Sequence, residues 1–192
     1  MLRAAERAAV LWKNGGGLTR EVAVYPHGTD LASFDWRVSL AEVHHGGPFS
    51  IFPQVDRQMA VIAGKLELSI TGRSPLTLSP ESEPCQFAGD AAVYAAPLQG
   101  PVTDLNVMTR RGRFAAHLHR CRAAASVMLP LEADTTLIVA LGPFSVRAAS
   151  LEASLAPLDA LCLNAEPYRC VTASSEGAAL ELWLIEIRAQ SQ

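Results

Sequence analysis

The stretch MAVIAGKLELSI, residues 59–70, consists of two short apolar runs on either side of Gly64. In the second run, Leu66, Leu68 and Ile70 alternate with polar or charged residues, which is the period of a half-buried β-strand. A glycine between two such runs is typical of a turn. Residues 136–148, TLIVALGPFSVRA, repeat the order of strand, glycine and strand, which suggests an internal duplication.

Two further pairs of segments support the duplication. FAGDAAVYAAP (87–97) resembles LAPLDALCLNAEP (155–167), and VTDLNVMTR (102–110) resembles ALELWLIEIR (179–188), in the same order along the chain. This succession of strands and turns is the layout of a small double-sheet jelly roll. We therefore predict an all-β, bicupin-like fold of two small jelly-roll β-barrels or sandwiches packed together, with a few short helices. The predicted domains are 1–113, which carries the candidate pocket, and 114–192.

Helical periodicity is nearly absent from the sequence. One or two helical turns are expected around Arg3 to Leu11, and a second, weaker candidate is Ala123 to Met128. Three consecutive glycines, Gly15 to Gly17, follow Lys13 and Asn14. Lysine precedes these glycines and a strand follows them, so we predict a tight turn at the edge of the pocket and not a phosphate-binding loop.

The composition excludes several classes of protein. The 192 residues are 49% hydrophobic and 18% charged with a formal net charge of −3, so no basic field exists for nucleic acid or an anionic membrane. No apolar run reaches the roughly 18 residues of a membrane span, and a cytoplasmic location is expected. The four cysteines show no CxxC spacing, which argues against a disulfide or a Cys-rich zinc site.

A catalytic cupin usually binds a metal through an HxH pair, a following Glu and a later His. Here Ser50 and Phe52 occupy the HxH spacing, Arg57 stands near the place of the carboxylate, and Thr103 near that of the last His. Phenylalanine cannot ligate a metal and arginine has the wrong charge. We therefore predict neither a metal nor another cofactor.

Two histidine groups are alternative candidates for a metal site. His44 and His45 are adjacent, so they point to opposite faces of a strand. His117, His119 and Cys121 alternate and share a face, which could begin a tetrahedral site. We favour a polar edge strand for this triple, since no fourth ligand stands at a known spacing.

Polar side chains on two otherwise apolar strands raise the question of a pocket. In FDWRVSLAEV (34–43), Arg37 and Ser39 share one face, and Trp36, Val38 and Leu40 share the other. In TDLNVM (103–108), Asp104 and Asn106 share a face. Each group suits either a solvent-facing rim or the mouth of a barrel, and the alternation alone leaves both open.

Several blocks together resemble the HutD/Ves family: WKNGGGLTRE (12–21), WRVSLAEV (36–43), GPFSIFPQVDR (47–57), the strand ending at Gly64, and TDLNVMTRRG (103–112). One departure is Gln54, where the family commonly has glycine. The resemblance implies a bicupin fold without the usual metal ligands and an association with histidine degradation or environmental stress. It also implies a shared pocket of residues at motif positions: Asn14, Arg37, Ser39, Ser50, Arg57, Asp104 and Asn106.

We therefore expect a non-enzymatic, cupin-like protein that binds a small carboxylate and has a regulatory or accessory role in histidine utilisation. Urocanate and N-formylglutamate are the candidate ligands that the resemblance implies. The alternative is a cupin-type isomerase or hydrolase with Asp104 as general base; neighbouring Arg37 and Arg57 would keep that carboxylate ionised, which argues against it. A pure interaction protein stays open, and so does a homodimer.

Overall fold

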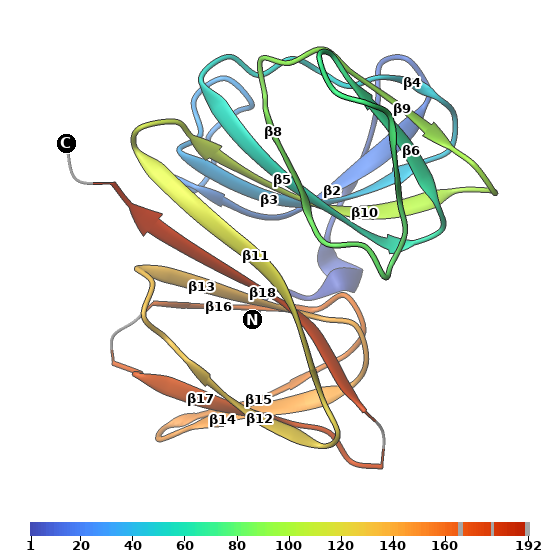
Figure 1. Cartoon of the computed structure of the whole chain (residues 1–192). Coiled ribbons are helices and arrows are strands. Elements are labelled where there is room, and N and C mark those ends of the chain that lie inside the picture. The colour runs from blue at the N-terminus through green and yellow to red at the C-terminus, as the bar shows by residue number, and fades with distance from the viewer. Residues whose placement is uncertain (165–166, 178, 191–192) are drawn as a thin grey trace. The chain divides into compact units, whose positions relative to one another are not determined.

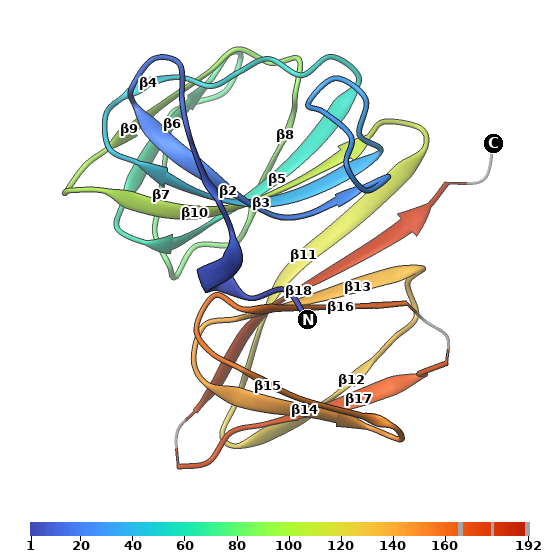
Figure 2. The same ribbon diagram turned by 180° about the vertical axis from the view of Figure 1, so that it is seen from behind.

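The computed structural model describes residues 1–164, 167–177 and 179–190. The chain divides into two compact units (Figure 1; seen from behind in Figure 2). The first unit comprises residues 7–115. The second unit comprises residues 116–190 together with the first six residues, so it is built from both ends of the chain.

The first unit contains two antiparallel sheets that face each other. Its strands are β1 (Ala9–Leu11), β2 (Gly17–Tyr25), β3 (Trp36–Val43), β4 (Gly47–Pro48), β5 (Val55–Ala63), β6 (Leu66–Ile70), β7 (Leu76–Leu78), β8 (Cys85–Ala88), β9 (Val93–Pro97) and β10 (Val102–Arg110). One sheet has the order β1-β2-β3-β10-β5-β8, and the other has the order β4-β9-β6-β7. This is the predicted jelly-roll layout.

Apolar side chains from both sheets fill the space between them. Leu66, Leu68 and Ile70, whose alternation predicted a strand, are buried against Met59 and Val61 of the opposite sheet. Burying side chains of this size stabilises the fold by about 1.5–3 kcal/mol each. The core of the first unit therefore rests on the alternation visible in residues 59–70.

The second unit repeats the arrangement. Its strands are β11 (Phe114–Ala123), β12 (Ser126–Pro130), β13 (Thr135–Ala140), β14 (Phe144–Ala148), β15 (Leu151–Leu155), β16 (Ala160–Asn164), β17 (Cys170–Ser174) and β18 (Leu180–Ala189). The two four-stranded sheets have the orders β11-β18-β13-β16 and β12-β17-β14-β15. Apolar residues from both sheets form one core cluster.

The sheet orders confirm the duplication and correct one of its three segment matches. β5 and β6 correspond to β13 and β14, and β10 corresponds to β18, as predicted. However, β8 holds the sheet position that β16 holds in the second unit, whereas the predicted match equated β8 with β15. When two halves of a chain are aligned, short apolar strands of equal length match equally well if the alignment is shifted by one strand. Their alternation alone does not distinguish one strand from the next.

Both helix predictions need correction. Only Ala4–Glu6 of the first segment is helical, as a short 3₁₀ helix, and Ala9–Leu11 is a strand. The second candidate is wrong: Ala123 ends β11, and Ser126 begins β12, which pairs with β17. Alanine-rich sequence favours helix locally, but pairing with a neighbouring strand outweighs that weak preference. Among the described residues, no helix has the length and apolar character that a membrane span requires.

Candidate functional site

The polar residues of the site lie on one face of the large sheet in the first unit. Ser39 on β3 lies directly opposite Asn106 on β10, and Arg37 lies opposite Met108. On the other side of β10, Arg57 of β5 also lies opposite Met108. Alternate residues of a strand share a face, so this register brings side chains from three strands together.

These side chains line a cavity of about 750 Å³. All seven predicted residues line it: Asn14, Arg37, Ser39, Ser50, Arg57, Asp104 and Asn106. The alternative in which Ser39 faces water is wrong, because Ser39 is 2% exposed. The sheet face continues into the apolar core at Met59 and Val61, so the cavity opens at one end of a filled barrel.

A chain of hydrogen bonds forms the floor of the cavity. Nη2 of Arg57 donates to Oδ1 of Asn106 at 2.7 Å, and Nδ2 of Asn106 donates to Oδ1 of Asp104. All three residues are buried. Nε of Arg57 and Oδ2 of Asp104 are both buried and have no hydrogen-bond partner among the described residues. Unpaired buried polar atoms cost about 1–3 kcal/mol each, so this floor has unused capacity to bind a polar group.

Arg57 is surrounded by aromatic rings. Its guanidinium carbon lies 5.0 Å from the ring centre of Phe49, 4.9 Å from that of Phe87 and 5.8 Å from that of Phe52. Burial lowers the pKa of Arg57 to about 10; Asp104 opposes this shift and Arg37 adds to it. Arg57 therefore stays cationic at neutral pH, and aromatic rings replace much of its hydration.

Asp104 is fully buried, and burial raises its pKa to about 7 against the opposing effects of Arg57 and the hydrogen bond from Asn106. The expectation that the arginines keep this carboxylate ionised is therefore wrong. Burial penalises the charged form of Asp104 strongly. The positive charge of Arg57, which is linked to Asp104 only through Asn106, favours that form less. Because Oδ1 accepts from Asn106, a proton on neutral Asp104 resides on Oδ2.

Arg37 differs from Arg57 because a carboxylate already neutralises it. Its Nε donates to Oε2 of Glu21 at 2.9 Å, and its Nη1 lies 3.4 Å from Oγ of Ser39. Arg57 has no ion pair with any side chain that the structure describes. Of the two arginines proposed to grip a carboxylate, Arg57 is thus the one whose charge is not already neutralised.

Asn14 and Ser50 lie at the exposed end of the cavity. Oδ1 of Asn14 accepts a 3.0 Å hydrogen bond from the amide of Gly16, so its side chain organises the glycine turn. Gly15 has a φ of 69°, and a Cβ at Gly17 would lie 2.2 Å from the carbonyl oxygen of Glu42. The predicted tight turn is confirmed, and β2 begins at the last of the three glycines, Gly17.

Sequence reasoning missed most of the walls and mouth of the cavity. Trp12, Phe49 and Phe52 supply aromatic walls, and Val10, Leu11 and Leu31 line the opening. Met108 was recognisable, since it continues the alternation of Asp104 and Asn106. The apolar residues at the opening carried no signal, because nothing in residues 9–12 or 29–31 distinguishes a rim from a surface.

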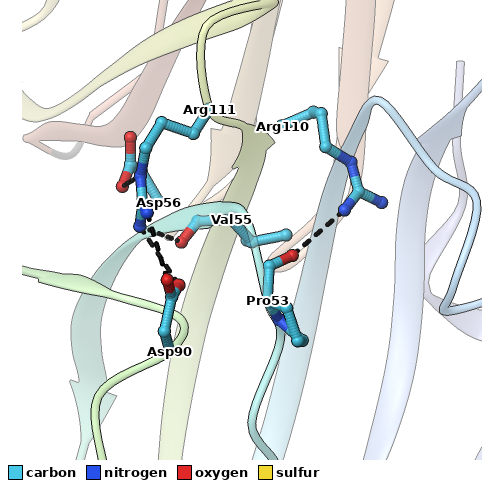
Figure 3. A network of polar contacts seen from close by, with 6 residues as sticks. All are labelled: Pro53, Val55, Asp56, Asp90, Arg110 and Arg111. Carbon is cyan, nitrogen blue, oxygen red and sulfur yellow. Dashed lines mark hydrogen bonds and ion pairs between the residues drawn. The ribbon is translucent and has the colours of Figure 1, made fainter.

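Two arginines at the end of β10 fix the segment that carries Phe49 to Arg57 (Figure 3). Arg110 donates to the carbonyl oxygens of Pro53 at 3.2 Å and of Ala32 and Phe34 at 3.0 Å. Arg111 donates to the carbonyl oxygen of Val55 and pairs with Asp56 and Asp90. Arg110 therefore joins two loops that both line the cavity.

The other candidates lie outside the cavity. Thr103 does not line it, because it alternates with Asp104 on β10. The rings of His117 and His119 are 4.9 Å apart, but Cys121 packs against the apolar core of the second unit. Within the described residues, no group of three or more His, Cys, Asp or Glu side chains could hold a metal ion.

Comparisons with known proteins confirm the resemblance to the HutD/Ves family. The HutD family matches the sequence over residues 4–180. The chain is 40% identical over 105 residues to protein Ves of Citrobacter koseri, covering 54% of this chain and 53% of that protein. It is 30% identical over 154 residues to an uncharacterized 21.2 kDa protein from the hutC 3′ region of Pseudomonas putida, covering 77% and 80%. The chain thus spans about half the length of the Ves protein.

Solved structures share the whole fold. HutD from Pseudomonas fluorescens has a TM-score of 0.83 at 27% identity and covers 99% of this chain and 98% of its own. A conserved protein of unknown function from Pseudomonas aeruginosa has a TM-score of 0.89 at 27% identity, with 97% of each chain covered. A cupin from Leptotrichia buccalis, at 11% identity and a TM-score of 0.62, covers 93% of this chain and 92% of its own and shows the cupin fold alone.

Proposed function

The chain belongs to the HutD family, and on that premise we propose that it is a cupin-like binding protein that holds a small carboxylate against Arg57. The observation that carries the proposal is the floor of the cavity. Arg57 is a buried cation without an ion-pair partner among the described residues, and its Nε lacks a hydrogen bond. A planar guanidinium edge with free donors matches the two oxygens of a carboxylate.

Asp104 supports the same ligand. Below its pKa of about 7 this residue is mostly neutral, and its Oδ2 can donate a hydrogen bond to an anion. The floor then offers two unpaired donors, one from Arg57 and one from Asp104. A carboxylate that accepts from both would satisfy the atoms that the protein leaves unpaired.

The remaining side chains suggest a modest affinity. Ser39, Ser50 and Asn14 can add neutral hydrogen bonds of about 0.5–1.5 kcal/mol each, and a charged one contributes about 1.5–3 kcal/mol. After the cost of immobilising the ligand, dissociation constants from roughly micromolar to millimolar follow. This range suits a protein that senses a metabolite pool.

We propose a regulatory or accessory role in histidine utilisation, with urocanate and N-formylglutamate as the first ligands to test. The support is family membership, and the cavity adds the carboxylate chemistry common to both acids. Calorimetric titration of each acid into the wild type, Arg57→Ala and Arg37→Ala tests the proposal. The exposed, Glu152-paired Arg147 of the second unit provides a matched control variant, Arg147→Ala.

We expect Arg57→Ala to abolish measurable binding, Arg37→Ala to weaken it less, and Arg147→Ala to leave it unchanged. Absence of heat from both acids in the wild type would contradict carboxylate binding by these two ligands. Unchanged affinity in Arg57→Ala would contradict the assignment of the site.

One observation keeps the enzyme alternative in view. A carboxyl group whose pKa lies near 7 and whose Oδ2 is unpaired has the properties of a general acid or base. This alternative predicts turnover of a bound acid that stops in Asp104→Asn. Proton NMR spectra of each acid incubated with the two proteins distinguish turnover from simple binding.

A further inference from the structure

We propose that the ligand is an amphipathic monoacid, whose apolar or aromatic body fills the outer part of the cavity and contacts Val10, Leu11 and Leu31. This inference rests on the proposed function, because it takes the carboxylate at Arg57 as the fixed end of the ligand. It goes further by naming what is attached to that carboxylate, and of the two acids named above it favours urocanate, because N-formylglutamate carries a second carboxylate.

The first argument is the size of the cavity. A carboxylate occupies only the space beside Arg57, Asn106 and Asp104, whereas the cavity measures about 750 Å³. Pockets of roughly 300–1,000 Å³ typically bury ligands of drug size. Most of the cavity is therefore available to the rest of the ligand.

The second argument is the change in chemistry from floor to mouth. Above the polar floor, Trp12 and Phe49 meet edge to face with ring centres 6.4 Å apart. Nε1 of Trp12 already donates to Oγ1 of Thr19 at 2.8 Å, so the indole presents its apolar surface without an unmet polar atom. The middle of the cavity thus favours an apolar or aromatic group.

The third argument is the exposure of the rim. Val10, Leu11 and Leu31 are 65%, 77% and 53% exposed, and all three line this same cavity. Large apolar side chains that gather at one opening mark a binding site more often than isolated ones do. Because these side chains continue the aromatic walls of the cavity, the apolar body of the bound acid is the occupant that fits this rim.

The charges near the mouth balance one another and therefore do not favour a second carboxylate. Asp30 lines the cavity and accepts hydrogen bonds from the amides of Ala32 and Ser33 and from the Ser33 hydroxyl. These bonds, that from the Ser33 side chain foremost, lower the pKa of Asp30 and keep it anionic. Glu21 is engaged by Arg37, which leaves Lys13 as the cavity-lining cation near the mouth without an ion-pair partner among the described residues.

The test is a calorimetric series of acetate, hexanoate, 3-phenylpropionate and glutarate with wild-type protein. Each methylene that leaves water contributes about 0.8 kcal/mol, which is about a fourfold gain in affinity. We expect hexanoate and 3-phenylpropionate to bind at least about tenfold more tightly than acetate, and glutarate to gain little. Leu11→Ser and Leu31→Ser should lose much of that gain.

Two control variants sharpen the result. Met128→Ser removes a similarly exposed apolar side chain from the second unit and should change nothing. Lys13→Ala tests the competing assignment: tight glutarate binding that disappears in this variant would overturn the monoacid proposal in favour of a dicarboxylate.

Other outcomes are equally decisive. Equal affinity for all four acids would overturn the inference and leave carboxylate binding at Arg57 intact, whereas no binding of any acid would contradict both. The other possible occupant of the apolar rim is a second copy of the chain, bound along the free edge of β1. Light scattering after gel filtration tests for such a dimer. A wild-type dimer that Leu11→Ser converts to a monomer, with acid affinities unchanged, would overturn the proposal.

Discussion

Arg57 donates a 2.7 Å hydrogen bond to Asn106, and this bond decides which way the Asn106 amide faces. Arginine can only donate, so the amide oxygen turns toward it and the NH₂ group is left for the carboxylate of Asp104. The amide thus connects a buried cation and a buried acid that share no direct hydrogen bond.

Replacing Asn106 with leucine should therefore destabilise the protein. Asn106→Leu keeps the volume but leaves a donor of Arg57 and an acceptor of Asp104 buried without partners, which costs about 1–3 kcal/mol each. The matched control is Ser39→Ala, since Ser39 is equally buried, lies opposite Asn106 and makes one long contact. Urea denaturation measures both, and equal losses below about 1 kcal/mol would contradict the bridging role.

Asp104 should make stability depend on pH. Its folded pKa of about 7 lies above its ordinary value of 3.8, so the folded protein holds the proton more tightly than the unfolded chain. The contribution is therefore most favourable below pH 4 and is lost as pH rises to 7. We expect the free energy of unfolding of the wild type to fall by about 2 kcal/mol more than that of Asp104→Asn between pH 5 and pH 8. Parallel curves for the two proteins would contradict this.

The same group should tune carboxylate binding. Protonation removes a negative charge from the floor beside Arg57 and adds a donor at Oδ2, so an anion should bind more tightly at pH 6 than at pH 8. A change of about threefold to tenfold is expected from titrations of one monoacid at both values. In Asp104→Asn the affinity for the acid should no longer depend on pH. If the dependence persists in this variant, another group must cause it.

Arg110 should act on binding without touching the ligand. It joins the loop of Ala32 and Phe34 to Pro53 through three carbonyl oxygens, and both loops line the cavity. Arg110→Met should weaken acid binding and lower the free energy of unfolding by about 1–2 kcal/mol. Arg110→Lys keeps the charge but cannot reach all three carbonyls, so it should restore little. If the lysine variant matched the wild type, charge and not loop fixation would explain the effect.

The glycine run offers a graded test of backbone packing. A side chain at Gly17 would place its Cβ 2.2 Å from the carbonyl oxygen of Glu42, whereas at Gly16 the nearest atom is 3.3 Å away in the Asn14 side chain. We expect Gly17→Ala to cost more than about 2 kcal/mol and Gly16→Ala less than about 1 kcal/mol. Thermal melts of the two variants measure which one is less stable. If Gly16→Ala were the less stable, the close approach of residue 17 to the Glu42 carbonyl would not be the reason for glycine here.

The sequence allowed the fold to be predicted because it depends on alternation, whereas the full set of cavity residues came from the family resemblance. Leu66, Leu68 and Ile70 indicated a strand, and the shared parity of Arg37 with Ser39 and of Asp104 with Asn106 placed each pair on one face. Gln54 shows the limit of this reasoning. Its φ of 60° suits the glycine that the family resemblance implies at this position, but the conformation is visible only in the folded loop.

The properties that depend on several segments at once could not be predicted. The burial of Asp104, which sets its pKa, results from strands that are distant in sequence. Leu11 of β1 and Leu31 of the segment between β2 and β3 line one opening only because these two segments converge. The carbonyl partners of Arg110 are backbone atoms that no side-chain pattern reveals.

The first six residues have a consequence for how the chain can be dissected. Leu2 pairs with Ala160, and Asp159 accepts hydrogen bonds from the side chain of Arg3 and the amide of Ala4, at 2.7 Å each. Residues 1–6 and 116–190 thus form the second unit together, and the first unit lies between them in the sequence. Truncation at the amino terminus would remove part of the unit encoded more than a hundred residues away, and would leave the cavity residues in place.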